Sequence, residues 1–247
     1  MTRILVANLS YEYPDGTRAL QDVSFAIEPG KSVGIVGENG AGKSTLLRHL
    51  NGSLAPQQGS VRIGEWAVER RHFARVRQVV GMVMQDPDDQ LFMPTVFDDV
   101  AFGPRNLNWN EEQVHSCAME ALRRVGAEHL AQRPPYRLSG GEKRAVAIAT
   151  VLSMQPQVLD MDEPTSNLDP KSRRVLIDWL RQCKQTLIVA GHDLDMIADV
   201  CARTIVLHQG RIKADAPTLE IFTNDVLLRE CELERPLRMQ NCPRCGQ

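Results

Sequence analysis

Residues Gly37 to Thr45, with the sequence GENGAGKST, restrict the folds open to this chain more than any other stretch. They fit the pattern G-x-x-x-x-G-K-[ST], in which a glycine-rich loop binds phosphate oxygens through its backbone N–H groups. An apolar, β-branched run (32–36) precedes the loop, and leucines at helical spacing (46–50) follow it, as the motif requires. The glycine spacing excludes the dinucleotide-binding pattern G-x-G-x-x-G. We therefore predict a phosphate-binding loop between a buried strand and a helix.

The side chains of this loop indicate how it would hold a nucleotide. In P-loop proteins the lysine, here Lys43, reaches the β- and γ-phosphates, and the next hydroxyl, here Ser44, binds Mg²⁺. Tyr13 is a further candidate, because a ring stacked on the base and a packed edge aromatic explain it equally well. The candidate nucleotide-binding residues of the loop are Gly37, Glu38, Asn39, Gly40, Ala41, Gly42, Lys43, Ser44 and Thr45.

Composition sets limits on partners and location. The 247 residues include 29 basic and 31 acidic side chains, so no basic excess indicates a nucleic acid partner. The first residues lack the apolar core of a signal peptide, and no apolar run approaches the roughly 18 residues of a membrane span. Six cysteines in a chain of this length do not indicate a disulfide framework. We expect a cytosolic protein that reaches a membrane only through a partner.

Apolar runs of strand length alternate with helical patterns along most of the chain, which predicts an α/β fold. The block from about 89 to 150 breaks this alternation, and we interpret it as a helical lobe inserted in the α/β core. Within it, Asn110 and Gln113 form a capping-box pattern at the start of a predicted helix over 110–125. Other predicted strands are 3–9, 20–28, 60–63, 78–84, 186–190 and 204–207, and a further predicted helix is 194–201.

A second strong signal is a short strand that begins at Val158 and ends in two adjacent carboxylates, Asp162 and Glu163. One carboxylate in this position can hold Mg²⁺ through water, and its neighbour can orient and deprotonate an attacking water. A strand-end turn is the alternative, but a P-loop requires such a partner, so we favour the catalytic interpretation. Asp160 fits neither role, because the residue that follows it, Met161, is not acidic. A carboxylate inside a core strand is costly unless it is paired or protonated.

Three weaker candidates lie where strands end or helices begin. Gln85 ends the predicted strand 78–84, and His192 follows the strand 186–190, at the edge where open α/β sheets bind ligands. Taken alone, these two are more simply a surface glutamine and a structural histidine. Ser139-Gly140-Gly141 opens a helix and suits an anion, although such a run is also an ordinary loop. The candidate catalytic residues are Glu163, His192, Gln85 and Lys43, and the candidate metal-binding residues are Ser44, Gln85 and Asp162.

Taken together, these motifs resemble those of the ATP-binding cassette (ABC) ATPases over about residues 3–235. The resemblance implies a P-loop NTPase core with an N-terminal antiparallel β subdomain and an inserted α-helical subdomain. It implies ATP and Mg²⁺ as cofactors. It also implies an ABC ATPase domain over 1–235, with the helical lobe at about 89–150, and a C-terminal tail over 236–247.

The resemblance further implies a role for each of five single residues. Tyr13 is similar to the adenine-stacking aromatic of the family. Gln85 is similar to the glutamine that responds to Mg²⁺ and to the membrane partner. Asp162 resembles the Walker B aspartate, Glu163 the catalytic glutamate, and His192 the switch histidine.

Two longer motifs and two departures complete the comparison with the family. Ser139-Gly140-Gly141 is similar to the signature motif, and residues 167–169 are similar to the D-loop. Glu142 stands where the family usually has a glutamine, a change that also occurs in several of its importers and does not argue against activity. Asp160 stands where the family usually has an apolar residue, which leaves the packing of its strand open.

Two segments resemble one branch of the family, the energy-coupling-factor importers, and especially their cobalt and nickel members. They are DDQLFMPTV (88–96) and DDVAFGP (98–104). This branch implies two cassettes, identical or paralogous, at the cytoplasmic face of the membrane. The cassettes drive an integral membrane scaffold and a substrate-binding subunit. A vitamin importer of the same type is the alternative.

A soluble ABC ATPase that acts on DNA or on the ribosome is the other class considered. The DNA-acting class needs a long coiled coil between the P-loop and the signature, and no sustained heptads occur before Leu138. The ribosome-acting class usually carries two cassettes per chain, and this chain has one. We therefore expect no nucleic acid partner.

Two further predictions concern segments outside the nucleotide motifs. The apolar stretch from Leu91 to Val96 is predicted to dock a membrane partner, with packing inside the helical lobe as the alternative. Cys242 and Cys245 have the spacing of a zinc-binding pair, but the chain has no second pair of this kind. A frayed terminus with two idle thiols is therefore the favoured interpretation.

Overall fold

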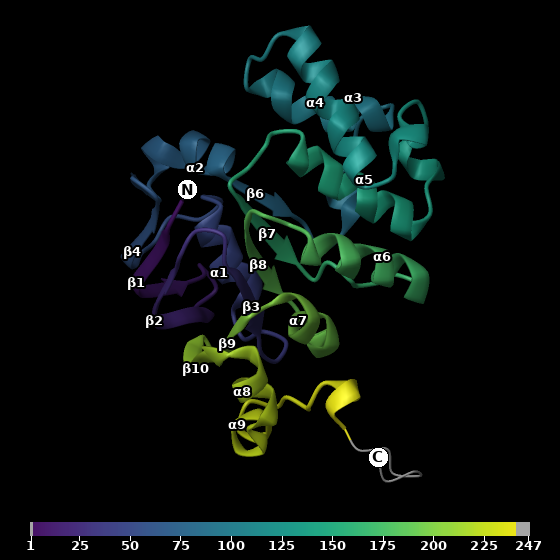
Figure 1. Ribbon diagram of the computed structural model, residues 1–247. Helices are drawn as coiled ribbons and strands as arrows, with labels where there is room; N and C mark the ends of the chain where they lie inside the picture. Colours follow the sequence, from purple (N-terminus) through teal and green to yellow (C-terminus); the bar gives the residue numbers. More distant parts are fainter. Residues whose placement is uncertain (1, 241–247) are drawn as a thin grey trace.

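A computed structural model describes the chain from residue 2 to residue 240 (Figure 1). An antiparallel sheet forms the N-terminal part of the described chain. Its strands are β1 (Ile4–Glu12), β2 (Arg18–Ile27), β4 (Gln58–Ile63) and β5 (Trp66–Ala67). The order in the sheet is β2-β1-β4-β5, and β1 pairs antiparallel with both β2 and β4. The first three strands overlap the predicted ones, so the expected antiparallel β subdomain is confirmed.

A six-stranded sheet forms the centre of the molecule. Its strands are β3 (Ser32–Val36), β6 (Val80–Val83), β7 (Val158–Asp162), β8 (Thr186–Ala190), β9 (Arg203–His208) and β10 (Arg211–Pro217). The order is β10-β9-β3-β8-β7-β6; β10 is antiparallel to β9, and the other neighbours run parallel. Every residue of β7 and β8 is buried, as expected for parallel strands that are covered on both faces.

The predicted strand over 78–84 is wrong at its start. Residues Phe73–Val79 form helix α2, and β6 begins only at Val80. The sequence is apolar from Val79 onward, so periodicity does not separate the last turn of a helix from a buried strand. Strand β10 was not predicted at all, because its residues alternate between half-buried and exposed positions and form no continuous apolar run.

Helices cover the central sheet and build a separate lobe. They are α1 (Lys43–Leu50), α3 (Val96–Asn106), α4 (Glu111–Arg124), α5 (Gly140–Leu152), α6 (Pro170–Arg181), α7 (Leu194–Val200), α8 (Thr218–Thr223) and α9 (Asp225–Glu230). Helices α3, α4 and α5 pack on one another at the upper right of Figure 1 and form the predicted helical subdomain. The capping box of α4, between Asn110 and Gln113, is confirmed. The domain boundaries at 235 and 236 stay predictions.

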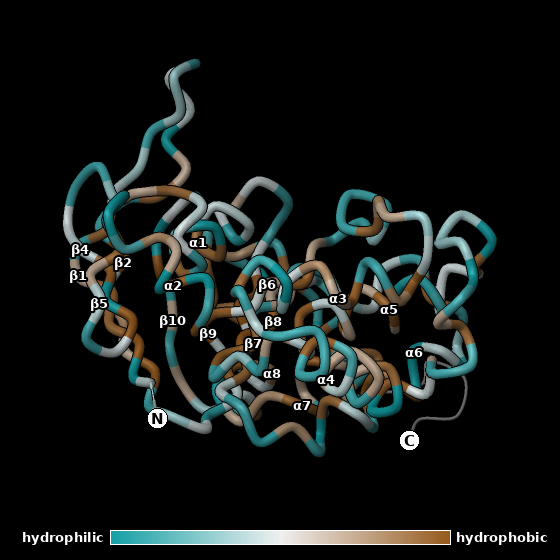
Figure 2. The backbone as a smooth tube through the Cα atoms, turned by 90° about the horizontal axis from the view of Figure 1, so that it is seen from above, coloured by the Kyte–Doolittle hydropathy of each residue, from teal (hydrophilic) through white to brown (hydrophobic). Residues whose placement is uncertain are grey.

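Two apolar cores lie on the two faces of the central sheet. Val33 and Ile35 of β3 belong to the core that α1 and the antiparallel sheet share, whereas Val36 belongs to the core that the helical lobe, α6 and α7 share. Figure 2 shows the hydrophobic segments along the central strands and the hydrophilic ones mainly in the outer loops. The P-loop follows β3 directly, so both cores fix its position.

Asp160 lies inside β7 and is fully buried. Neither of its carboxyl oxygens has a hydrogen-bond partner among the described residues. Burial, with the nearby Asp162 charge adding to it, raises the pKa of Asp160 well above its usual value. Of the two conditions predicted for this residue, paired or protonated, the structure therefore favours the protonated form.

The tail prediction falls on residues that the structure does not describe. Cys242 and Cys245 lie outside residues 2–240, so a metal role for them stays a prediction. Within 2–240, no group of three or more His, Cys, Asp or Glu side chains is arranged to hold a metal ion. No helix in that range combines the length and the apolar character that a membrane crossing needs.

Candidate functional site

The P-loop wraps tightly at the start of α1. Gly42 has a φ of 102°, and a Cβ there would lie 2.3 Å from the Ala19 carbonyl oxygen, so only glycine fits this position. The buried Lys43 ammonium donates hydrogen bonds to the carbonyl oxygens of Gly37 (2.8 Å) and Glu38 (3.0 Å). The lysine thus spans the loop, with its charge where phosphate oxygens would lie.

Glu38 anchors the loop to the end of β9. Its carboxylate accepts a hydrogen bond from the Gln209 N–H (2.9 Å) and lies 2.9 Å from His208 Nδ1. Burial opposes ionisation of Glu38, but these two contacts outweigh it and lower the pKa of the carboxyl. The sequence alone does not reveal His208, because its partner lies 170 positions away and no local pattern marks the pair.

Tyr13 reaches the P-loop through a hydrogen bond. Its hydroxyl lies 3.0 Å from the Thr45 hydroxyl, and its ring makes an edge-on contact with Tyr11 at 5.1 Å between centroids. The ring is half-buried and belongs to the loop after β1. The structure therefore brings Tyr13 to the nucleotide loop, and a stacking role for it stays a prediction.

Asp162 and Ser44 form the part of the site that fits a Mg²⁺ ion. Asp162 ends β7 and is 5% exposed, and its Oδ1 has no hydrogen-bond partner among the described residues. Burial raises the pKa of its carboxyl, while a hydrogen bond with the Ser44 hydroxyl acts in the opposite direction. A buried carboxylate oxygen without a partner, next to a hydroxyl, is the kind of donor set that Mg²⁺ prefers.

Glu163 and His192 meet at the carboxyl ends of β7 and β8. Glu163 Oε2 lies 2.8 Å from His192 Nδ1 and accepts a 3.3 Å hydrogen bond from the His192 N–H. Glu163 is 7% exposed and has a φ of 48°, a left-handed value that is strained for a non-glycine residue. Strain of this kind concentrates at functional sites. The structure thus brings together two residues that the sequence predicts at the ends of two separate strands.

Gln85 is held by its backbone rather than by its side chain. The buried Arg144 of α5 donates hydrogen bonds to the carbonyl oxygens of Met84 (2.7 Å) and Gln85 (2.6 Å). Within residues 2–240, no hydrogen bond ties the Gln85 side chain to Ser44 or Asp162, and its metal role stays a prediction. Arg144, which the sequence analysis missed, links the helix after Ser139 to the Gln85 loop.

The helix start at Ser139 lies apart from the P-loop. Ser139 caps α5, and the Glu142 carboxylate accepts hydrogen bonds from the Ser139 N–H and hydroxyl, both at 2.8 Å. Helix α5 packs in the core of the helical lobe, whereas α1 packs in the core on the other face of the sheet. No hydrogen bond or ion pair joins Ser139, Gly140 or Gly141 to residues 37–45 in the described part of the chain.

The apolar stretch after the Gln85 loop is divided between the two alternatives proposed for it. Leu91 and Val96 are buried in the helical lobe, but Phe92 is 63% exposed and makes an edge-on contact with the exposed Phe102 at 5.0 Å. The buried Asp99 carboxylate accepts the Phe92 and Met93 N–H groups at 3.0 Å each, which holds this turn in place. Phe92 and Phe102 thus form an exposed aromatic pair, named here the aromatic pair.

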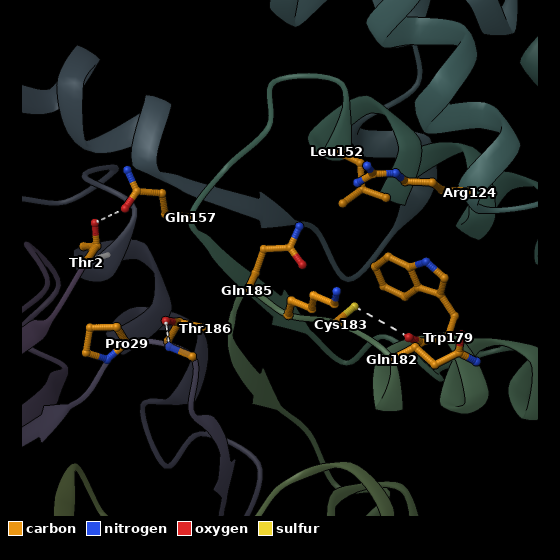
Figure 3. A pocket seen from close by; sticks show the side chains of 12 residues that line it. Thr2, Pro29, Arg124, Leu152, Gln157, Trp179, Gln182, Cys183, Gln185 and Thr186 are labelled. Atoms are coloured by element: carbon orange, nitrogen blue, oxygen red, sulfur yellow. Dashed lines mark hydrogen bonds between the residues drawn. The ribbon is translucent and has the colours of Figure 1, made fainter.

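Two of the cavities differ in whether predicted site residues border them. One, of about 820 Å³, is lined by Trp179, Cys183 and Gln185 among others, and none of the predicted site residues borders it (Figure 3). The second, of about 710 Å³, is bordered by His192 and by residues 165–167. The second cavity therefore belongs to the candidate site, and a further one, of about 650 Å³, is bordered by Ser139 and Gly141.

The fold and the site define a P-loop ATPase with a helical lobe inserted in its core. The family model described as "ABC transporter" matches residues 20–166, more than half of the chain. The chain belongs to this family, and it is an ABC ATPase, the ATP-hydrolysing type of transporter subunit. The predicted fold class is thereby confirmed.

Relatives and solved structures agree with this assignment. The chain is 60% identical to a "putative ABC transporter ATP-binding protein" of Geobacter sulfurreducens, over 98% of this chain and 97% of that protein. It is 44% identical to the "energy-coupling factor transporter ATP-binding protein EcfA" of Methanosphaera stadtmanae, over 96% and 87%.

Two solved structures match most of the fold. The structure of cbiO1 from Clostridium perfringens, described as part of the ABC transporter complex cbiONQ, has a TM-score of 0.81 and 37% identity, over 92% of this chain and 93% of that one. A dimeric ATP-binding cassette bound to ADP and Pi has a TM-score of 0.78 and 26% identity, over 87% and 98%.

Proposed function

We propose that this chain is the ATPase subunit of an energy-coupling-factor importer and that the imported substrate is cobalt or nickel. The likeness to EcfA and to cbiO1 supports the importer type. The observation that carries the hydrolytic part is the 2.8 Å contact between Glu163 and His192, beside the Asp162 oxygen that has no partner. The metal substrate rests on the resemblance of residues 88–104 to the cobalt and nickel branch.

In this proposal each group at the site has one task in ATP hydrolysis. The P-loop N–H groups and Lys43 bind the phosphates, and Ser44 and Asp162 would hold Mg²⁺, which neutralises phosphate charge. Glu163 accepts the proton of the attacking water, and His192 keeps the Glu163 carboxylate oriented and contacts the γ-phosphate. Gln85 approaches the metal when its loop moves with the membrane partner.

The substitution Glu163→Gln tests this assignment. Binding of ATP depends on the P-loop and is expected to change less than about threefold, because no P-loop contact is lost. Turnover is expected to fall by about 100-fold or more, since the amide cannot accept the proton. The exposed Glu120 provides the control, and Glu120→Gln should leave both quantities unchanged. Near-normal turnover of Glu163→Gln would refute the role of Glu163.

The second part of the proposal is a site shared between two cassettes. Within residues 2–240, no hydrogen bond or ion pair joins the helix start at Ser139 to the P-loop of its own chain, so we infer that it faces the γ-phosphate bound by a partner cassette. The dimeric cassette bound to ADP and Pi supports this arrangement. ATP and Mg²⁺ should therefore convert Glu163→Gln from monomer to dimer, alone or with a paralogue, in analytical ultracentrifugation. A variant that stays monomeric in both mixtures would contradict a shared site.

The third part assigns the aromatic pair to the integral membrane scaffold, which places the subunit at the cytoplasmic face of the membrane. The substitution Phe92→Asp should abolish uptake and co-purification with the membrane subunits, and leave the ATPase rate of the isolated subunit within about twofold. Leu219 on α8 offers a matched control, because it is also apolar and 63% exposed. Leu219→Asp should leave uptake intact. Misfolding of Phe92→Asp would favour packing within the lobe instead.

Uptake in cells tests the substrate. Cells with the wild-type chain should accumulate cobalt or nickel, and cells with Lys43→Ala should lose this accumulation, because phosphate binding is lost. Unchanged metal uptake together with impaired vitamin uptake would reverse the order of the two substrates. That result would leave the ATPase assignment untouched.

A further inference from the structure

An ion pair between α6 and α7 lies directly beside His192. Arg173, in the first turn of α6, donates two hydrogen bonds to the two carboxylate oxygens of Asp193, each at 2.7 Å. Asp193 is the residue that follows His192 and it caps α7, because its carboxylate accepts the Met196 N–H at 3.0 Å. A bidentate guanidinium–carboxylate pair fixes orientation as well as distance.

The Asp193 carboxylate connects more than these two helices. Burial acts to raise the pKa of that carboxyl, but the Arg173 guanidinium, the Met196 N–H and the nearby Thr165 hydroxyl, two residues beyond Glu163, together lower it. Three segments therefore converge on one side chain, namely the loop after β7, the start of α6 and the start of α7. Residues 165–167, Arg173, Asp193 and His192 also border one cavity of about 710 Å³.

His192 itself has little support of its own. Its side chain is 67% exposed, and its single ion-pair or hydrogen-bond partner among the described residues is Glu163. The position of its backbone therefore decides where the imidazole lies. That backbone is fixed on one side by the end of β8 and on the other side by Asp193.

We propose that Arg173 is a positioning residue for His192, acting through Asp193. By holding the carboxylate that follows His192, Arg173 keeps the imidazole within reach of Glu163 and of the γ-phosphate. Because Arg173 stands four residues after Asp169, it also ties the position of His192 to the segment 167–169. Any movement of that segment on contact with a second cassette is then transmitted to His192. This inference rests on the proposed hydrolytic roles of Glu163 and His192.

Loss of the pair should lower turnover without weakening ATP binding. Arg173→Met keeps an unbranched apolar stem and removes the guanidinium group with its charge. We expect kcat to fall by about 10- to 100-fold, since displacement of a reacting group by about 1 Å has effects of that size. The KM for ATP and the dissociation constant of ATP should change less than about twofold, because in the described residues no hydrogen bond or ion pair joins Arg173 to the P-loop. Arg173→Lys, which keeps the charge, should recover a measurable part of the rate.

A second pair in the fold provides the matched control. Arg203 and Asp215 form a bidentate pair with side-chain exposures of 35% and 25%, close to the 34% and 19% of Arg173 and Asp193. It joins β9 to β10, away from His192. Arg203→Met should lower the melting temperature by an amount similar to Arg173→Met but leave kcat within about twofold. Equal losses of kcat in both variants would reduce Arg173 to a structural role and overturn the inference.

The order of action is tested in combination with His192→Ala. If Arg173 acts through His192, then Arg173→Met should cause no further loss of kcat once the imidazole is absent. A full additional loss in the double variant would mean that Arg173 acts by another route, which refutes the proposal. A normal rate for His192→Ala alone would instead refute the hydrolytic role of His192, so the two failures are distinguishable.

Discussion

Replacement of Asp160 by valine should make this protein more stable, although the change lies two residues from Asp162. Asp160 is fully buried, neither of its oxygens has a partner within residues 2–240, and its strand neighbours Met82 and Ile188 are apolar. A buried carboxyl group without partners costs about 1–3 kcal/mol, and a buried valine contributes about 1.5 kcal/mol or more of favourable burial. Asp160→Val should thus raise the free energy of unfolding by about 2.5–4.5 kcal/mol.

The gain should also depend on pH, with a sign fixed by the raised pKa of Asp160. Below the unfolded-state pKa of about 3.9, the carboxyl is protonated in both states, and ionisation plays no part. Above it, the unfolded chain releases the proton while the folded chain keeps it. Wild-type stability therefore falls, relative to the variant, by about 1.4 kcal/mol per pH unit until the folded pKa is reached.

Thermal unfolding of nucleotide-free protein at pH 4, 5, 6, 7 and 8 tests both statements. For a chain of this length, 1 kcal/mol corresponds to about 2–4 °C in melting temperature. Asp160→Val should melt several degrees above wild type at pH 4, and the gap should widen with pH. Asp160→Asn, which keeps polar atoms but cannot ionise, should match wild type near pH 4 and exceed it at pH 8. A lower melting temperature of Asp160→Val at every pH would show that the carboxylate is paired, and would refute this reasoning.

Three other substitutions have expected outcomes. Gly81→Ala would place a Cβ 2.3 Å from Val151 Cγ1 and should lower the free energy of unfolding, measured by urea denaturation, by about 1–3 kcal/mol. An unchanged value would mean that β6 and α5 separate easily. Asn110→Ala removes one side of a capping box and should lower the melting temperature by about 2–4 °C, with ATP binding intact. An unchanged melting temperature would mean that the cap contributes nothing to stability. Glu38→Gln should weaken ATP binding several-fold in calorimetry, because the loop loses its anchor at β9; equal affinity would refute that anchoring role.

Local patterns in the sequence predicted the features that depend on neighbouring residues. The residues that make up the P-loop lie within a few positions of one another, and so do those of the capping box at Asn110. The start of β6 was misplaced because the apolar run from Val79 to Val83 continues across the boundary between a helix and a strand. Periodicity is a weak guide where every residue is apolar.

Long-range pairs were beyond the reach of such patterns. The contact between Glu38 and His208, and the hydrogen bonds from Arg144 to the Gln85 loop, join residues that the fold alone brings together. The sequence predicts that Glu163 and His192 each follow a core strand, but not that these strands are parallel neighbours or that the two side chains meet. The sequence predicts Gln85 as a metal-binding residue together with Ser44 and Asp162, and within residues 2–240 no hydrogen bond joins its side chain to either of them. A one-chain sequence also does not specify contacts that a second cassette would supply.

Glu142 has a consequence for the kinetics of the proposed shared site. The Ser139 N–H and, to a smaller extent, the Ser139 hydroxyl lower the pKa of its carboxyl group. This carboxylate already occupies the helix start that would receive a partner's γ-phosphate. In the proposed shared site, the Glu142 carboxylate would therefore compete with the partner's γ-phosphate for this helix start. Closure of two cassettes must first displace this anion, which makes the approach of the partner slower and more sensitive to ionic strength than a neutral amide at position 142 would.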